Sequence, residues 1–209
     1  MGIRQRIVPL TAALALTGGL AATEAAPAIA AHPASGQSAR PAAAGGTYLY
    51  FNKNQSNPSN SRLYLMKSVP NAKDKVLAKY RAGSGNGGRN GKNECARLQG
   101  WLPNGSYRVL AHTKRHDGGD GGINGYAIHV EDKVCKNGRT PRTALFVHSE
   151  MNVNGTQGAR QPGRDNPYRW DGVRDYYSLG CIKLTPAHIK NLFSKADHYG
   201  WPKRLKVVS

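Results

Sequence analysis

The sequence has 209 residues, with 30 Lys or Arg against 12 Asp or Glu, which gives a formal net charge of +18 at pH 7. Such an excess suits a solubilising surface, and it also suits attraction to a polyanion. No recognisable nucleic-acid motif is present, and the aromatic residues are not interleaved with a basic stripe, so we do not expect a nucleic-acid partner.

The N-terminus has the order of a secretory signal peptide. A short basic start, Met1–Arg6, precedes an apolar run, Ile7–Ala22, and the small-residue pattern Ala28–Ala30 follows. The apolar run is too short and too interrupted by glycine for a membrane span. We therefore predict that residues 1–30 are a signal peptide and that the mature protein is secreted or wall-associated, without a membrane span. Anionic cell-wall polymers are the expected partners of an exported basic protein.

Residues 31–46 consist mostly of Ala, Pro, Gly and Ser, and such a stretch cannot bury enough apolar surface to order itself. We predict a flexible linker there. Residues 47–209 remain, a length that suits one domain with its own core, and we expect this domain to be monomeric.

The sequence of this domain predicts mainly short strands separated by Gly-, Asn- and Pro-rich turns. Segments rich in β-branched and aromatic residues are Thr47–Asn52, Arg62–Met66, Lys75–Tyr80, Ser106–Ala111, Tyr126–Val130 and Ala144–His148. The Gly-rich segment 83–92 is a predicted loop. Residues 151–175 lack any apolar period and predict a long surface loop, which in a compact domain is often functional.

One helix is predicted late in the chain. Thr185 can cap it and Pro186 suits its first turn. Four apolar residues then share one helical face: Ile189, Leu192, Phe193 and Ala196. Gly200 ends the helix, and Arg204–Val208 predicts a closing strand. Many strands with one late helix indicate a mainly β barrel or sandwich.

The chain has three cysteines, an odd number. Export favours a disulfide, and one thiol must then remain free. Cys95 and Cys135 lie in polar, Gly- or Asn-containing contexts, whereas Cys181 lies between Gly180 and an apolar residue. We therefore predict a Cys95–Cys135 disulfide and a free Cys181. Either Cys181 has a chemical task, or it is an incidental buried residue.

The segment Ser178-Leu-Gly-Cys-Ile-Lys-Leu184 carries the sharpest chemical signal. A glycine before a cysteine lets backbone N–H groups approach a substrate and stabilise an oxyanion. A working thiol also needs a base, and His148, which ends an apolar strand-like segment, is the best candidate. His129 is the alternative base, although a lone histidine within an alternating strand is more often structural. The histidines lack paired metal-ligand spacing, so we expect no metal.

At these residues the chain resembles the L,D-transpeptidase (YkuD-like) family. An apolar strand ending in His148-Ser149, a loop, and then S-x-G-C-[apolar]-x-[apolar] match the family signature, and residues 100–109 resemble its T-P-x-G-x-Y-x-[apolar] segment. Two features depart from the family. Leu179 stands where a histidine is common, and the loop between His148 and Cys181 is longer than usual.

The resemblance implies an L,D-transpeptidase-like β-rich domain, with its late helix after a catalytic cysteine, that acts on peptidoglycan stem peptides without a cofactor. Cys181 would be the nucleophile and His148 its general base. Backbone amides near Gly180 and Cys181 would contribute to the oxyanion hole, and Ser149 and Ser178 would support the site. The acyl group would pass from Cys181 to an amine in transpeptidation, or to water in L,D-carboxypeptidase or hydrolase activity.

Three other interpretations are weaker. Papain-like wall hydrolases place the cysteine before the histidine, opposite to the order here. Sortases share the order found here but carry T-L-x-T-C followed by a catalytic arginine, whereas this chain has S-L-G-C with Arg204 as its only later arginine. A secreted basic binding or inhibitor protein on a degenerate transpeptidase fold is a non-catalytic alternative.

Overall fold

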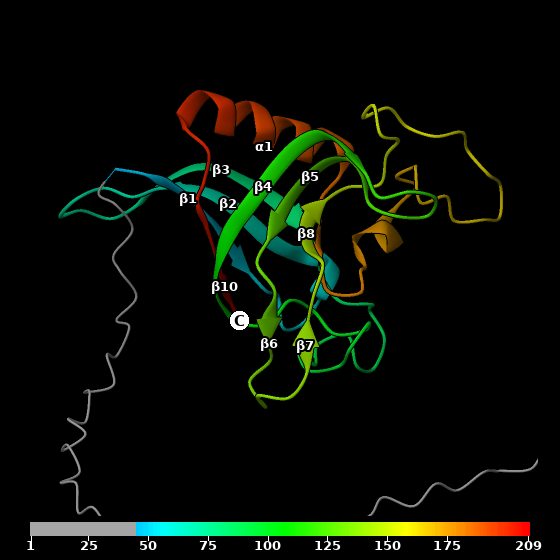
Figure 1. The fold of residues 1–209 in the computed structure, drawn as a ribbon, viewed down its shortest axis with the longest axis horizontal. Helices are drawn as coiled ribbons and strands as arrows, with labels where there is room; N and C mark the ends of the chain where they lie inside the picture. Colours follow the sequence, from blue (N-terminus) through cyan, green and yellow to red (C-terminus); the bar gives the residue numbers. More distant parts are fainter. Residues whose placement is uncertain (1–44) are drawn as a thin grey trace, which may run out of the picture. The chain divides into compact units, whose positions relative to one another are not determined.

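The computed structural model describes residues 45–209, which form a mainly β domain with one long helix (Figure 1). The strands are β1 (Thr47–Asn52), β2 (Ser61–Lys67), β3 (Lys75–Ala82), β4 (Gly105–Asp117), β5 (Asn124–Val130), β6 (Lys133–Val134), β7 (Pro141–Arg142), β8 (Leu145–His148), β9 (Ile182–Lys183) and β10 (Arg204–Val208). The helices are η1 (Pro58–Asn60), η2 (Val173–Tyr176) and α1 (Pro186–Tyr199). The expected β-rich fold and the expected helix after Cys181 are both present. The expected signal peptide, and all but the last two residues of the expected linker, lie outside the described residues.

Eight strands form one sheet in the order β3-β2-β1-β10-β4-β5-β8-β9, and β6 pairs with β7 in a separate hairpin. The backbone groups of Gly83, just after β3, and Lys183 of β9 exchange two hydrogen bonds of 3.0 and 2.9 Å. These bonds join strands from opposite ends of the order, so the sheet curls until its two edges meet. A Cβ atom on Gly83 would lie 2.3 Å from the Tyr176 carbonyl oxygen, which explains the glycine at this junction.

The core lies on the inner face of the curled sheet and under α1. Leu49 and Phe51 of β1 are fully buried, as period-2 alternation requires, whereas the side chains of Tyr48 and Tyr50 point outward. The Thr185 side chain accepts a hydrogen bond from the His188 N–H and caps α1. The predicted apolar face of the helix is the buried one: Ile189, Leu192, Phe193 and Ala196.

The long segment between β8 and η2 has no strand or α-helix in the described structure and lies on the β8 side of the sheet (Figure 1). The Tyr168 hydroxyl accepts a hydrogen bond of 2.7 Å from the Gly121 N–H, which ties this loop to the β4–β5 turn. The Gln157 side chain donates to the Glu150 carbonyl at 2.9 Å. The loop is thus anchored beside β8. No helix in residues 45–209 is long and apolar enough to cross a membrane.

Candidate functional site

Adjacent parallel strands bring Cys181 and His148 to one face of the sheet. Val147 of β8 is in register with Ile182 of β9, and His148 with Lys183. Val147 and Ile182 are both fully buried in the core. Because successive side chains alternate between faces, Cys181 and His148 share the opposite face as diagonal neighbours. Two residues that are far apart in the sequence therefore lie on the same face of the sheet.

Both residues line a cavity of about 550 Å³. Its walls come from the β4–β5 turn, the start of the long loop, and residues 177–183 before and within β9. Leu98 and Leu179, which are about 60% exposed, contribute apolar side chains to its lining. A larger hollow of about 690 Å³ lies within residues 160–175 and is lined by neither Cys181 nor a histidine. Of these two hollows, the one at Cys181 is lined by a thiol and an imidazole.

A backbone carbonyl fixes the orientation of His148. Its Nδ1 atom lies 3.0 Å from the Ser149 carbonyl oxygen, which can only accept a hydrogen bond. Nδ1 therefore carries the proton, and Nε2 keeps the lone pair that a base needs. Burial, and then the nearby positive charge of Lys183, lower the pKa of His148 to about 3. The imidazole is consequently neutral at physiological pH.

Cys181 forms no disulfide, as expected, and is half-buried. Burial raises the pKa of its thiol to about 11, although a backbone hydrogen bond from Phe146 and the charges of Lys183 and Arg142 act in the opposite direction. Its Sγ atom lies 3.7 Å from the carbonyl oxygen of Ala144, a residue with a positive φ of 53°. At physiological pH the thiol and the imidazole are therefore both neutral.

The two serines assigned supporting roles are placed differently. The Ser178 hydroxyl donates to the Cys181 carbonyl at 2.6 Å and accepts from the N–H groups of Gly85 and Gly180 at 3.3 and 3.2 Å, so it fixes the turn before β9. Ser149 acts on His148 through its carbonyl, while its own buried hydroxyl has no partner within residues 45–209. Because the Gly180 N–H already donates to Ser178, an oxyanion there would have to compete with that hydroxyl.

A buried ion pair lies beside the pair of candidate catalytic residues. Lys183 Nζ contacts Glu150 Oε1, and the two residues are only 7% and 9% exposed. Glu150 Oε2 is buried without a hydrogen-bond partner among the described residues. Burial raises the pKa of Glu150 to about 7, against the stabilising charge of Lys183. No local pattern predicts this ion pair, because the β8–β9 pairing is what brings the two residues together.

Replacing Lys183 by methionine is expected to lower the free energy of unfolding by about 3 kcal/mol at pH 8, because it leaves Glu150 as an uncompensated buried charge. The loss should be smaller at pH 5, where Glu150, with a pKa of about 7, can take up a proton. Denaturant unfolding at the two pH values measures this difference. Adding Glu150→Gln should remove the pH dependence, and an equal loss at both pH values would contradict the assignment.

Three carboxylates, those of Glu150, Asp165 and Asp175, place one oxygen each within 4.8 Å of one another and could together offer ligands to a cation. Lys183 already neutralises Glu150, however, and Asp175 Oδ2 accepts from the N–H groups of Asp171 and Gly172 at the start of η2. Two of the three carboxylates are thus engaged by protein groups, and we assign no metal to the cluster.

The predicted Cys95–Cys135 disulfide is present, with a Cα–Cα distance of 5.3 Å. The alternative base, His129, stacks on Phe146 at a ring-centroid distance of 4.5 Å and does not line the cavity that contains Cys181. Tyr177 lines this cavity, whereas Trp170 packs edge-on against Tyr176 at 4.7 Å. Of the two histidines considered, His148 is the one that lines the same cavity as Cys181.

Arg142 of β7, which no sequence pattern singled out, holds the turn before Cys181. Its guanidinium is buried and donates hydrogen bonds to four backbone carbonyls, including that of Leu179, two residues before Cys181. An isolated arginine in the segment Arg139-Thr-Pro-Arg-Thr143 carries no local signal of burial. Only the tertiary structure brings the segments that it joins together.

A comparison with models of known protein families finds no match, and a comparison with curated proteins finds none either. Among solved structures, the chain is similar to that of Bdellovibrio bacteriovorus Bd1075, with a TM-score of 0.45 and 12% sequence identity. The match covers 78% of this chain and 47% of the other, so this chain spans about half of that protein. A likeness at this level leaves function to be argued from the residues themselves.

Proposed function

We propose that this chain is a secreted cysteine acyltransferase with an L,D-transpeptidase-like fold, acting on peptidoglycan stem peptides. The observation that carries the proposal is the pairing of β8 with β9, which places the free thiol of Cys181 and the fixed imidazole of His148 on one face, in one cavity. The signature around Ser178–Leu184 supplies the substrate class. The curled sheet and the helix after Cys181 are compatible with that fold.

In this mechanism, His148 Nε2 takes the thiol proton while Sγ attacks an amide carbonyl carbon of the stem peptide. The tetrahedral oxyanion collapses to a thioester, and the departing amine takes the proton from the imidazolium. A second amine, or water, then attacks the thioester, and His148 again accepts the proton. The Cys181 thiolate leaves and takes that proton from the imidazolium, which regenerates the thiol, and the product is either cross-linked or trimmed.

Incubation of the mature protein with purified muropeptides, followed by mass spectrometry, tests the proposal. Cross-linked or exchanged products are expected if an amine is the acceptor, and shortened stems if water is. Both results support the cysteine chemistry. An unchanged muropeptide profile at equimolar enzyme would contradict it and would favour the binding-protein alternative.

The outer face of the sheet supports a proposed interaction with anionic wall polymers. Lys79, Tyr64, Tyr50 and Lys206 are direct neighbours across β3, β2, β1 and β10. The two tyrosine rings are 5.8 Å apart, and the lysine ammonium groups lie 5.7 and 6.0 Å from the ring centroids beside them. This row presents positive charge flanking aromatic surface, which suits a polymer carrying phosphate groups.

The double variant Lys79→Glu/Lys206→Glu is expected to bind a glycerol phosphate polymer about tenfold more weakly at low salt, because charge reversal turns attraction into repulsion. Co-sedimentation with wall polymer at rising salt measures this. The matched control, Lys190→Glu/Lys195→Glu, changes the net charge equally but lies on α1. Equal losses in both variants would show that net charge alone, and not this face, attracts the polymer.

A further inference from the structure

Three consecutive backbone carbonyl groups fix the segment that carries Cys181, because each accepts a hydrogen bond from a side chain. The Leu179 carbonyl accepts from Arg142 Nη2 at 3.1 Å, the Gly180 carbonyl accepts from the Ser84 hydroxyl at 3.2 Å, and the Cys181 carbonyl accepts from Ser178. Gly180 has a φ of 138°, and a Cβ atom there would lie 2.3 Å from Arg142 Nη2. The close approach of the guanidinium therefore requires glycine immediately before the cysteine.

Arg142 also holds a second segment. Its Nη1 donates to the carbonyls of Glu94 and Trp101 at 2.5 and 3.2 Å, and its Nη2 donates to that of Gly100 at 2.7 Å. No carboxylate pairs with this buried guanidinium among the described residues, where its hydrogen-bond partners are backbone carbonyls. One side chain thus connects the 94–101 segment to the turn before Cys181.

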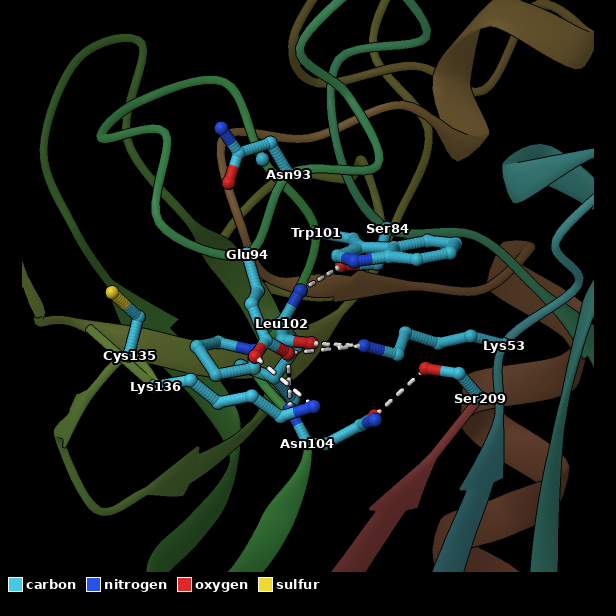
Figure 2. A network of polar contacts seen from close by, with 12 residues as sticks. Lys53, Ser84, Asn93, Glu94, Trp101, Leu102, Asn104, Cys135, Lys136 and Ser209 are labelled. Atoms are coloured by element: carbon cyan, nitrogen blue, oxygen red, sulfur yellow. Dashed lines mark hydrogen bonds and ion pairs between the residues drawn. The ribbon is translucent and has the colours of Figure 1, made fainter.

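The 94–101 segment is itself fixed at both ends. Figure 2 shows Glu94 between Lys53, Lys136 and Asn104, with its carboxylate accepting from the Asn104 N–H at 2.9 Å. Lys53 Nζ is buried, donates to the Leu102 carbonyl at 3.0 Å and lies 3.7 Å from Glu94 Oε2. A movement of this segment would therefore disturb a buried polar network, which makes it a firm support for Arg142.

The disulfide joins the same two parts of the chain. Cys95 follows Glu94 directly, and Cys135 lies on the hairpin that carries Arg142, where its N–H bonds to the Thr140 carbonyl at 3.1 Å. The covalent bond and the guanidinium therefore act in parallel between the 94–101 segment and the β6–β7 hairpin. Through its hydrogen bond to the Leu179 carbonyl, Arg142 connects this restrained pair of segments to the turn before Cys181.

We propose that Arg142, braced by the Cys95–Cys135 disulfide, is a positioning residue that holds the Leu179–Cys181 turn so that the thiol stays partly buried in the cavity that His148 also lines. The inference rests on the proposed function for its activity readout only. The burial of the thiol can be measured without any substrate.

Arg142→Met should act on Cys181 in two opposite ways. Its turn loses a donor and opens, so alkylation of Cys181 by iodoacetamide at pH 8 should become about tenfold faster. Burial is the largest cause of the raised thiol pKa, so its loss should outweigh the loss of the Arg142 charge, which lowers that pKa. Turnover of stem peptides should fall about tenfold or more through kcat, with KM within a factor of about two. Arg142→Lys should lie between the wild type and Arg142→Met, since an ammonium group cannot span all four carbonyls.

Two further variants complete the test. Cys95→Ser/Cys135→Ser should shift both readouts in the same direction as Arg142→Met, and Arg139→Met, an exposed arginine on the same hairpin, should shift neither. Rates are expressed per folded molecule from circular dichroism, so that a loss of folded protein does not count. Wild-type alkylation and kcat in Arg142→Met would overturn the proposal. If the wild type fails to process stems, the proposed function fails, while the alkylation comparison still decides the role of Arg142.

Discussion

Replacing Cys181 by serine is expected to lower the turnover of tetrapeptide stems by about 10³-fold or more. A hydroxyl is far less acidic than a thiol, so the imidazole of His148, whose pKa is about 3, should deprotonate it far less readily. The substitution is nearly isosteric at a half-buried position, so circular dichroism and thermal unfolding should stay close to those of the wild type. Product formation measured by mass spectrometry is the readout.

The disulfide offers an internal control for this experiment. Peptide mapping without reductant should find Cys95 linked to Cys135 in both proteins, with alkylatable thiol only at Cys181 of the wild type. If the serine variant processes stems at the wild-type rate, Cys181 is not the nucleophile. A disulfide that includes Cys181 in active protein would lead to the same conclusion.

His148→Gln is expected to lower turnover by about 10²–10⁴-fold, because the thiol loses its general base. The matched control is His129→Gln, whose ring stacks on Phe146 and does not line the cavity, and it should keep most of the activity. Steady-state rates per folded molecule measure both effects. A larger loss in the His129 variant than in the His148 variant would reverse the assignment of the base.

The pH dependence provides a separate check on the same pair. Since burial holds the pKa of His148 at about 3, the imidazole stays a base well below pH 6.5, and kcat/KM should not decline through the range in which an exposed histidine protonates. Between pH 6.5 and 3 the unfolded chain binds a proton at His148 that the folded chain does not. This residue therefore lowers stability as the pH falls through that window.

The alkylation rate of Cys181 should depend on pH at the alkaline end of the range. Burial raises the pKa of Cys181 to about 11, so alkylation in the absence of substrate should keep rising with pH beyond 9, without a plateau near the ordinary thiol value. A plateau below pH 8 would mean that the resting thiol is already ionised, in conflict with a neutral resting pair.

Local sequence patterns account for the longer elements and for the disulfide. The alternation in Thr47–Asn52 and the apolar face of residues 186–199 each specify one buried side, so strand and helix follow from the residues alone. The strand expected at Ser106–Ala111 continues to Asp117, because pairing with β5 extends it beyond its apolar part. The strands β6, β7 and β9 have two residues each, which is too short for an alternation of apolar and polar residues to be detected.

The sequence pointed to the two candidate residues that share the cavity, Cys181 and His148, but not to the contacts around them. The spacing of His148 and Cys181 within two short motifs indicates their roles, while the pairing that unites them is a property of the curled sheet. Arg142 and the Lys183–Glu150 pair depend on contacts between segments far apart in the chain. Buried charges of this kind leave no mark in local composition, so sequence analysis passed over them.

The most direct measurement of the central claim is the intact mass of the mature protein mixed with a tetrapeptide stem and quenched in acid within its first turnovers. The account predicts an added acyl mass that proteolysis locates on Cys181, that hydroxylamine removes as expected for a thioester, and that is missing from Cys181→Ser. An acyl adduct on another residue, or stem turnover with an unmodified and fully alkylatable Cys181 at every time point, would contradict it.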